Sequence, residues 1–502
     1  MTRTLSESRL VTLSGLGGMG KTRLAAEAAD RVADLAPDGV WWVDLSGVSD
    51  PDLVLPTAAS ALGLIEEAGR PLRETLVAAV RHSRTLIVLD NCEHLLSAAA
   101  GLAAEASAAG PGVRVLATSR EPMGLPGEVV VPVPPLDLPA SSSPEELAEA
   151  DAVRLFAERA AVARPGFRVD EVNATQIADI CRQLDGIPLA IELAAARVKV
   201  LGLRELAERL QDRFDLLGTN PLGAPRQQTL RAVLDWSYDL LAEPERRLFD
   251  RLGAFYGGFG LDAAEHVCAF PPLTGSELIE LLARLVDKSL VAVTEIRGRA
   301  RYSRIETVRL YARERLGSSV EEAEVRSRHA DWCLDLARTS ERADGEAAAL
   351  DRVEIEHDNF RSALAWAVQR DPGRAVALVS VLAPFWDRRG HLSEGRRWAE
   401  EALAAGGDVP GRNVVFTWLG RLARYDARYA DAEELLHRAA DASRENQDPS
   451  GTAVALTELG RVAGLQGQRS TARFLYREAL GLFREAADDG GSAEVMLLLG
   501  QL

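Results

Sequence analysis

Up to about residue 135, hydrophobic positions form short, nearly continuous runs that are separated by segments long enough to be helices. The runs cover residues 9–14, 39–45, 84–90, 113–119 and 128–133. Strands buried on both faces of a parallel sheet show this pattern, and the helices between them provide the crossover connections. The pattern therefore predicts an α/β domain with a parallel sheet over residues 1–135.

The next segments lose this pattern. Residues 134–146 are rich in proline and serine and end in a helix start signal at Ser143 and Pro144, which predicts a domain boundary. Residues 145–215 show only helical periodicity and predict an all-α helical domain. Residues 228–316 combine helices with a β pattern that turns at Arg297 and Gly298. That order of elements predicts a helical domain closed by a hairpin, as in a winged-helix-like domain.

Beyond about residue 320 the pattern is helical and repeats itself. Residues 418–442 align with 458–482, residues 498–502 begin a third copy, and glycines recur every 40 positions at 420, 460 and 500. Small residues at fixed spacing let paired helices approach each other, so we predict an α-solenoid of TPR-like repeats over residues 320–502. Because a solenoid needs a polar terminal cap, we also expect the sequence to be part of a longer protein.

Composition excludes several classes of protein. The net charge of −17 opposes binding to a phosphate backbone, so the chain is not mainly a DNA-binding surface. No apolar run approaches the ~20 residues of a membrane span, and residues 1–9 lack the apolar core of a signal peptide. The four cysteines form no Cys-x-x-Cys pair, which fits reduced thiols better than disulfides or zinc. We expect a cytoplasmic protein without a membrane partner.

Residues 15–22, GLGGMGKT, match the motif G-x-x-x-x-G-K-[ST] between a predicted strand and a predicted helix. Such a loop wraps backbone N–H groups around phosphate oxygens at the positive end of the helix. Lys21 would neutralise the β- and γ-phosphates, and the hydroxyl of Thr22 would bind Mg²⁺. An ordinary glycine-rich turn is the alternative. The predicted nucleotide-binding residues of this loop are Gly15, Gly17, Gly18, Gly20, Lys21 and Thr22.

Two acids follow the hydrophobic run 85–89. Asp90 would lie at the carboxyl edge of the sheet beside the phosphates and support Mg²⁺ together with Thr22, although an Asp after a strand can also cap a helix. Glu93 lies one helical turn further on. It could polarise water for hydrolysis, or it could be a first-turn acid favoured by the helix dipole.

The run 113–119 ends next to Arg120. An arginine at that edge can bind the γ-phosphate and so distinguish a triphosphate from a diphosphate. The alternative is a solvated charge next to Glu121. The candidate catalytic residues are thus Asp90, Glu93 and Arg120.

The order of motifs GLGGMGKTRLA, LIVLDNCEHL, VLATSREPMG, GIPLAIELAAARV, LDWSYDLL and RIETVRLYARERL resembles the STAND class of signal-transduction ATPases. It is similar in particular to the NB-ARC-type core of actinobacterial transcriptional regulators of the SARP and LuxR kinds. The resemblance covers residues 9–316 and, more loosely, the repeats. It implies a P-loop NTPase domain that binds ATP or ADP with Mg²⁺, and helical and winged-helix domains that close over ADP and open upon exchange for ATP.

The resemblance also assigns roles to single residues. Pro188 of GIPL corresponds to the family proline that packs on adenine, although a proline that merely starts a helix is the alternative. Glu306 stands where many relatives have a histidine that contacts the ADP β-phosphate, and a carboxylate there would repel that phosphate. Asn91 stands where many relatives have a second Asp, and an amide cannot act as a general base. Hydrolysis should therefore be slow.

The sequence leaves two main hypotheses for function. The first is an ATP/ADP-dependent regulatory switch whose repeats sense a protein or small-molecule inducer, with a nucleotide-dependent oligomer as one outcome. The second is a non-hydrolysing interaction scaffold that holds ADP structurally. We expect contact with DNA only indirectly, or through a domain that this sequence does not contain.

Overall fold

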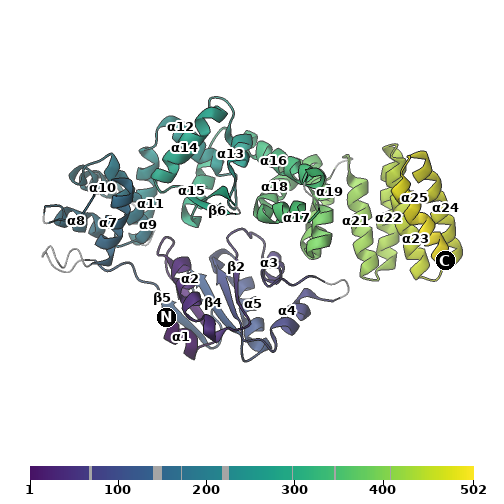
Figure 1. Cartoon of the computed structure of the whole chain (residues 1–502), viewed down its shortest axis with the longest axis horizontal. Helices are drawn as coiled ribbons and strands as arrows, with labels where there is room; N and C mark the ends of the chain where they lie inside the picture. The colour runs from purple at the N-terminus through teal and green to yellow at the C-terminus, as the bar shows by residue number, and fades with distance from the viewer. Residues whose placement is uncertain are drawn as a thin grey trace. The chain divides into compact units, whose positions relative to one another are not determined.

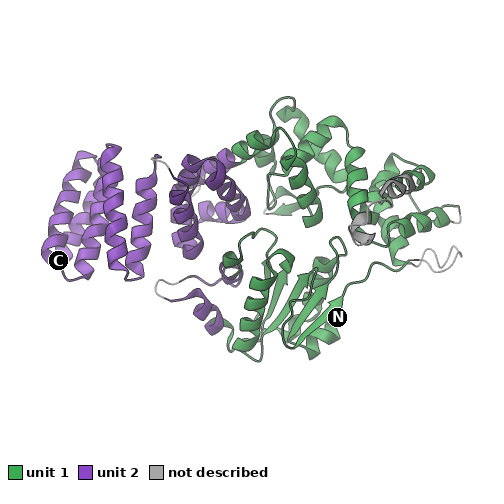
Figure 2. Cartoon of the chain, turned by 180° about the vertical axis from the view of Figure 1, so that it is seen from behind, with its two compact units in different colours: residues 1–54, 79–329 green, residues 55–78, 330–502 purple. Residues whose placement is uncertain are grey.

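The computed structural model describes residues 1–66, 70–138, 150–170, 172–217, 225–296, 298–343, 346–406 and 409–502. The predicted helix start at Ser143 and Pro144, and Arg297 of the predicted turn, lie outside these residues. The chain divides into two compact units, residues 1–54 with 79–329 and residues 55–78 with 330–502 (Figure 2).

The first unit contains the predicted parallel sheet. Its strands are β1 (Leu10–Ser14), β2 (Val40–Asp44), β3 (Leu86–Asp90), β4 (Arg114–Ser119) and β5 (Glu128–Pro132). They pair in the order β2-β3-β4-β1-β5, all parallel (Figure 1). This confirms the predicted α/β fold. Since β4 lies between β1 and β3, the carboxyl ends of these three strands form one continuous edge.

Helices pack on this sheet through small side chains. Helix α2 (Lys21–Arg31) contributes alanines to a buried cluster with Val11, Leu13, Val88 and Leu116 of the strands, and α1 (Thr2–Glu7) adds Leu5. Alanine lets the helix backbone approach the sheet closely, which fixes where α2 begins relative to β1. The other helical segments up to β4 are η1 (Ala33–Leu35), η2 (Pro51–Leu53), α3 (Val54–Ala61), α4 (Leu72–Val80), η3 (Cys92–His94) and α5 (Leu96–Ala109). Most of α3 and α4 belongs to the second unit.

The rest of the first unit is mainly helical. Its first group comprises α7 (Asp151–Ala163), α8 (Ala174–Gln183), α9 (Pro188–Ala195), η4 (Ala196–Lys199) and α10 (Leu203–Leu217). Its second group comprises α11 (Pro225–Asp239), α12 (Glu243–Leu252), α13 (Leu261–Cys268), α14 (Gly275–Asp287), the antiparallel hairpin β6 (Ala292–Ile296) and β7 (Arg299–Ser303), and α15 (Glu306–Gly317). The predicted hairpin is present. The winged-helix assignment of this group stays a prediction.

The second unit is an array of antiparallel helices, with α16 (Glu322–Ala343) crossing the boundary between the units. Its helices are α17 (Glu346–Ile355), α18 (His357–Arg370), α19 (Pro372–Arg389), α20 (Leu392–Ala404), α21 (Arg412–Tyr425), α22 (Tyr429–Glu445), α23 (Pro449–Leu465), α24 (Arg469–Glu485) and α25 (Asp489–Gln501). From α21 onward, consecutive helices pack on each other (Figure 1). The predicted repeats of paired helices are therefore confirmed, and α25 begins the third copy.

The backbone conformation follows the same 40-residue period as the sequence. Ala427, Gln447, Gly467 and Ala487 follow four successive helices and adopt positive φ angles between 53° and 79°. A left-handed residue after the last turn satisfies helix carbonyls and reverses the chain, which is the usual end of a helix. Such a residue recurs every 20 positions, just after the end of each helix, and two helices make one repeat of 40 residues.

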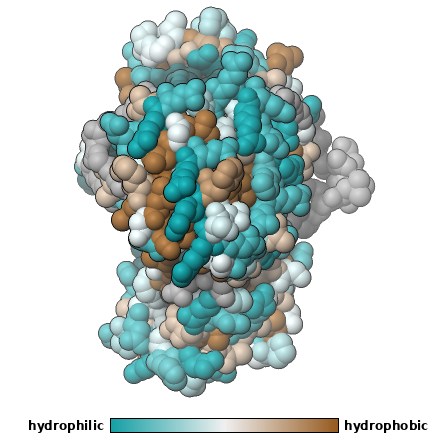
Figure 3. Space-filling model, turned by 90° about the vertical axis from the view of Figure 1, so that its right-hand side faces the viewer, coloured by the Kyte–Doolittle hydropathy of each residue, from teal (hydrophilic) through white to brown (hydrophobic). Residues whose placement is uncertain are grey.

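The C-terminal end of the chain exposes apolar side chains, whereas the thiols are buried. A band of apolar side chains lies among hydrophilic ones on the face of the molecule nearest the chain's C-terminal end (Figure 3). Met496 and Leu497 of α25 are 50% and 64% exposed. All four cysteines are buried and free of disulfides. Across the described ranges, the helices are too short or too polar to span a bilayer.

Candidate functional site

The glycine loop between β1 and α2 forms a cradle of backbone N–H groups. Gly18 and Gly20 adopt left-handed φ angles of 78° and 82°, which side-chain-bearing residues rarely adopt. Gly20 is the N-cap of α2, so the free N–H groups of the first helical turn follow directly after the loop. Exposed N–H groups at a helix N-terminus form an anion site. The loop therefore fits a nucleotide phosphate chain.

Lys21, the first residue of α2, points its ammonium back into the loop. Its Nζ atom donates hydrogen bonds to the carbonyl oxygens of Gly15 and Leu16, at 2.8 and 3.1 Å. Burial lowers the pKa of Lys21, and the positive charge of Arg120 acts in the same direction. Within the described residues no carboxylate lies at ion-pair distance from this ammonium. An anion at the loop would supply the missing counter-charge.

Asp90 ends β3 and is buried at the shared edge of the sheet. Its Oδ1 accepts a hydrogen bond of 2.9 Å from the hydroxyl of Thr22 and another from the hydroxyl of Thr118 on β4. Burial raises the pKa of Asp90, while the two hydroxyl hydrogen bonds oppose that shift. A hydroxyl and a carboxylate placed together in this way suit Mg²⁺, which takes oxygen ligands and retains several waters. Sequence reasoning gave Thr118 no role, although it stands in VLATSR.

Asn91 follows Asp90 in a left-handed conformation, with φ of 61°. Its backbone N–H donates to the Thr118 hydroxyl at 2.9 Å, and its side-chain Nδ2 lies 3.4 Å from Oδ1 of Asp44. Asparagine is one of the few non-glycine residues that tolerates this backbone region. Asn91 thus shapes the turn after β3 and links it to β2 and β4.

Glu93 and Arg120 form an ion pair at the same edge. The Arg120 Nε donates to Glu93 Oε1 at 3.0 Å, and the two side chains are 40% and 11% exposed. The other carboxylate oxygen of Glu93 is buried without a hydrogen-bond partner among the described residues. Arg120 therefore pairs with Glu93 and not with its sequence neighbour Glu121. An incoming anion would compete with Glu93 for the arginine.

Two helices that are distant in the sequence contact the loop. The backbone N–H of Leu189 in α9 donates to the carbonyl of Gly18 at 3.2 Å. A Cβ on Gly17 would lie 3.0 Å from the hydroxyl of Thr307 in α15. Pro188 is the first residue of α9 and is half-buried, next to the loop contact.

Glu306, the first residue of α15, also lies near the loop. Burial and the charge of Glu93 raise its pKa, while Arg309 opposes the shift. Its electrostatic influence reaches Lys21. The negative charges of Glu93 and Glu306 thus act on the same small region as the cations Lys21 and Arg120.

A cavity of about 250 Å³ adjoins the loop within the first unit. It is lined by Leu16, Gly17, Arg120, Leu230, Arg231, Leu234, Thr307, Leu310, Tyr311 and Glu314. Arg231 of α11 forms a bidentate ion pair with Glu314 of α15, in which its two terminal guanidinium nitrogens donate to the two carboxylate oxygens at 2.6 and 2.7 Å. Pro188 does not line this cavity. The cavity therefore joins the loop and Arg120 to α11 and α15.

Comparisons with known proteins agree with this arrangement. The NB-ARC domain model matches residues 2–124, and a tetratricopeptide repeat model matches residues 412–485. An uncharacterized Mycobacterium tuberculosis protein is 42% identical over 329 residues, covering 65% of this chain and 81% of that protein. A candidate HTH-type transcriptional regulator of the same organism is 45% identical over 409 residues, covering 80% of this chain and 45% of the regulator.

Two further proteins are similar to this chain at lower identity. The regulatory protein AfsR of Streptomyces griseus is 29% identical over 484 residues, covering 87% of this chain and 46% of AfsR. The chain thus spans less than half the length of these named regulators. A crystal structure of a STAND protein with a tetratricopeptide repeat sensor from Pyrococcus horikoshii aligns with a TM-score of 0.47 at 16% identity, covering all of this chain and 78% of that one.

The loop geometry, the helical repeats and the matches converge on one family, and the similarity to the Mycobacterium protein extends over four fifths of its length. The chain belongs to the same family as this Mycobacterium protein, and it carries an NB-ARC domain and tetratricopeptide repeats.

Proposed function

We propose that this chain is a regulatory switch that binds ATP or ADP with Mg²⁺ and transmits the nucleotide state to its helical parts. The observation that carries the proposal is that the glycine loop contacts two helices, α9 and α15, that are distant from it in the sequence. Gly18 bonds to Leu189 of α9, and Gly17 packs against Thr307 of α15. A movement of the loop upon phosphate binding would therefore reach both helices.

In this proposal the loop residues Gly15, Gly17, Gly18, Gly20 and Lys21 hold the phosphates. Thr22 and Asp90 support the metal ion. Pro188, at the start of α9, would pack on the base. Mg²⁺ would neutralise phosphate charge and orient the γ-phosphate for attack by water.

Arg120 would act as the sensor of the γ-phosphate. Since Glu93 accepts from Arg120, capture of the arginine by a γ-phosphate would release the carboxylate of Glu93, which could then orient water. Asn91 provides no second carboxylate, so turnover would be slow, as suits a switch rather than a metabolic ATPase.

The repeats would provide the sensing surface for a protein or small-molecule inducer. Relatives named as regulators support a role in transcription, with DNA contacted indirectly or by residues outside this sequence. A cytoplasmic location and a nucleotide-dependent oligomer are part of the proposal.

The test is to denature the purified chain and identify the released nucleotide by chromatography. The switch predicts about one ADP per chain, and its loss in a Lys21→Ala variant. Thr57→Val in α3 is a matched control, because the Thr57 hydroxyl makes no hydrogen bond to any described residue. A chain that carries no nucleotide and binds neither ATP nor ADP would refute the proposal.

The second candidate is a scaffold in which ADP is a structural component. Asn91 favours it, because the amide that follows Asp90 in the turn cannot act as a general base for turnover. ADP that stays bound through dialysis against excess ATP, with no turnover, would support this candidate.

A further inference from the structure

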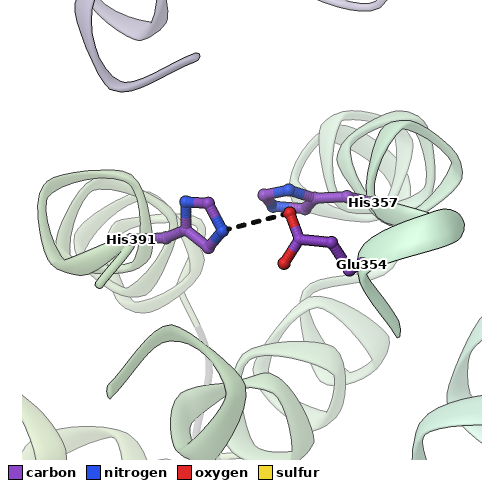
Figure 4. Close-up of side chains that lie close together, drawn as sticks. All are labelled: Glu354, His357 and His391. Carbon is purple, nitrogen blue, oxygen red and sulfur yellow. Dashed lines mark ion pairs between the residues drawn. The ribbon is translucent and has the colours of Figure 1, made fainter. Parts of the chain in front are cut away.

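A second cluster of chemically reactive side chains lies in the repeat unit, outside the nucleotide site. Glu354 of α17, His357 of α18 and His391, the N-cap residue of α20, offer ligand atoms that all lie within 4.8 Å of one another. Figure 4 shows the carboxylate of Glu354 reaching toward the His391 ring, with His357 beside it. The three residues come from three elements and are brought together by the packing of the array.

Both imidazoles are buried and incompletely bonded. His357 and His391 are 8% and 4% exposed. The Nε2 atom of each ring makes no hydrogen bond of good geometry with any described residue. The Nε2 of His391 lies 3.5 Å from Oε1 of Glu354. Buried polar atoms without a hydrogen bond are costly, and a bound ion is one way to satisfy them.

The geometry is close to that of a metal site. Zinc binds imidazole nitrogen and carboxylate oxygen at about 2.0–2.2 Å, so two ligand atoms on a tetrahedral ion are about 3.4 Å apart. The separation of 3.5 Å between His391 Nε2 and Glu354 Oε1 matches that edge, and all three ligand atoms lie within 4.8 Å of one another, so a bound ion would draw His357 closer. Two imidazoles and one carboxylate form a ligand set that takes Zn²⁺ and leaves a fourth position for water.

A neighbouring buried carboxylate faces one of the candidate ligand atoms. Glu394 is buried, and its Oε1 lies 3.3 Å from Nε2 of His357. Arg361 donates to both oxygens of Glu394, at 2.8 and 2.7 Å, so this carboxylate is already held in place. Because Glu394 faces the nitrogen that would bind the ion, its carboxylate would lie beside the cation and attract it, while Arg361 offsets part of that charge.

Local backbone and packing hold the site together. Gly390 adopts a left-handed φ of 76° at the end of α19 and directs the chain into His391. Phe385 packs at ring-centroid distances of 5.2 and 5.3 Å from His357 and His391, which gives the cluster an apolar wall. Glu354 is one-third exposed, so an ion could enter from solvent. Its other oxygen lies 3.9 Å from Nε of Arg389.

We propose that Glu354, His357 and His391 form a binding site for a divalent transition metal ion, Zn²⁺ in particular. The bound ion ties the junction of α17 and α18 to the start of α20. This site differs in chemistry from the nucleotide site, whose hydroxyl and carboxylate oxygens suit Mg²⁺. It is also independent of nucleotide.

The test uses the whole 502-residue chain, freed of affinity tag and stripped with a chelator. Bound Zn²⁺ is measured by equilibrium dialysis and elemental analysis without nucleotide. The expected result is one Zn²⁺ per chain, with affinity reduced more than tenfold in Glu354→Gln and in His391→Asn. His437→Asn, which changes an exposed histidine of α22, serves as the matched control and should bind like the native chain.

Glu354→Gln keeps the shape of a partly exposed side chain, so it should fold even if His391→Asn does not. Circular dichroism and ADP binding check the fold of each variant. Loading with Co²⁺ adds a spectroscopic readout, because a four-coordinate ion with nitrogen ligands absorbs visible light strongly. Absence of stoichiometric Zn²⁺ binding, or equal binding by the native chain and Glu354→Gln, would overturn the proposal.

Discussion

The hydroxyl of Thr22 donates a 2.9 Å hydrogen bond to the carboxylate of Asp90, which lies 68 positions away in the sequence. The contact joins the first turn of α2 to the end of β3. It forms because β1, β4 and β3 are neighbours and end at one edge of the sheet. Thr118 on the intervening strand donates to the same carboxylate oxygen. This three-residue arrangement leads to the first prediction.

Thr118→Val should weaken Mg²⁺-dependent ATP binding several-fold. The change keeps the shape of the side chain but removes one hydrogen bond from Asp90 and the acceptor of the Asn91 N–H, each worth roughly 1 kcal/mol. Titration calorimetry with and without Mg²⁺ measures the effect. The variant Thr57→Val makes the same chemical change away from the site. Unchanged Mg²⁺ dependence in Thr118→Val would show that Asp90 does not support the ion.

Glu306→Gln should increase ADP affinity several-fold. Glu306 places a carboxylate close enough to influence Lys21, and burial raises its pKa, so its ionised form is disfavoured where it lies. Removing that charge reduces repulsion of phosphate. Lowering the pH should act in the same direction in the native chain, because the raised pKa lets Glu306 take up a proton early.

The measurement is dissociation of a fluorescent ADP analogue, with Glu295→Gln in the exposed strand β6 as control. Faster release from Glu306→Gln than from the native chain would contradict the assignment.

Gly460→Ala should destabilise the repeats, whereas Gly464→Ala on the same helix should not. A Cβ on Gly460 would lie 2.3 Å from Cε1 of Tyr476, which forces α23 and α24 apart, at a cost of about 1–3 kcal/mol. A Cβ on Gly464 meets nothing within 4 Å, and alanine favours a helix over glycine by up to about 1 kcal/mol. Thermal unfolding of the two variants gives the comparison. Equal loss in both would refute close packing at Gly460.

The first unit should lose stability between about pH 4 and 6 through Asp250. Burial raises the pKa of Asp250 from 3.8 to about 6, although it accepts a 2.9 Å hydrogen bond from Tyr238. Below pH 3.8 the folded and unfolded states are both protonated. As the pH rises to 6 the unfolded state ionises first, so the contribution of Asp250 to folding falls.

Asp250→Asn keeps a hydrogen-bond acceptor and removes the titration. Melting temperatures measured from pH 4 to pH 7 should therefore depend less on pH in this variant than in the native chain. A steeper dependence in the variant would mean that the pKa of Asp250 is lowered in the folded state.

Periodicity and motif spacing predict much of this molecule. Runs of buried apolar residues predicted all five strands, and the repeat of glycines 40 positions apart predicted the helical array. Both depend on local patterns that burial imposes directly on the sequence. The loop motif likewise needs only contiguous residues.

Contacts that depend on tertiary packing could not be predicted from the sequence. The strand order, with β4 between β1 and β3, does not follow from the runs themselves, so the role of Thr118 could not be assigned. The partner of Arg120 is Glu93, 27 positions away, and not the adjacent Glu121. The cluster of Glu354, His357 and His391 could not be predicted, because Glu354 and His357 end and begin different helices and the third ligand, His391, lies 34 positions beyond His357. The roles assigned to the loop residues stay predictions.

The most direct test of the switch is hydrogen–deuterium exchange of the native chain with ADP and with a slowly hydrolysed ATP analogue, both with Mg²⁺. A switch requires that the two ligands favour different states. We predict different amide protection in residues 188–195 and 306–317, whose helices contact Gly18 and Gly17, with the difference abolished in Lys21→Ala. Identical protection of both segments with the two nucleotides bound would contradict it.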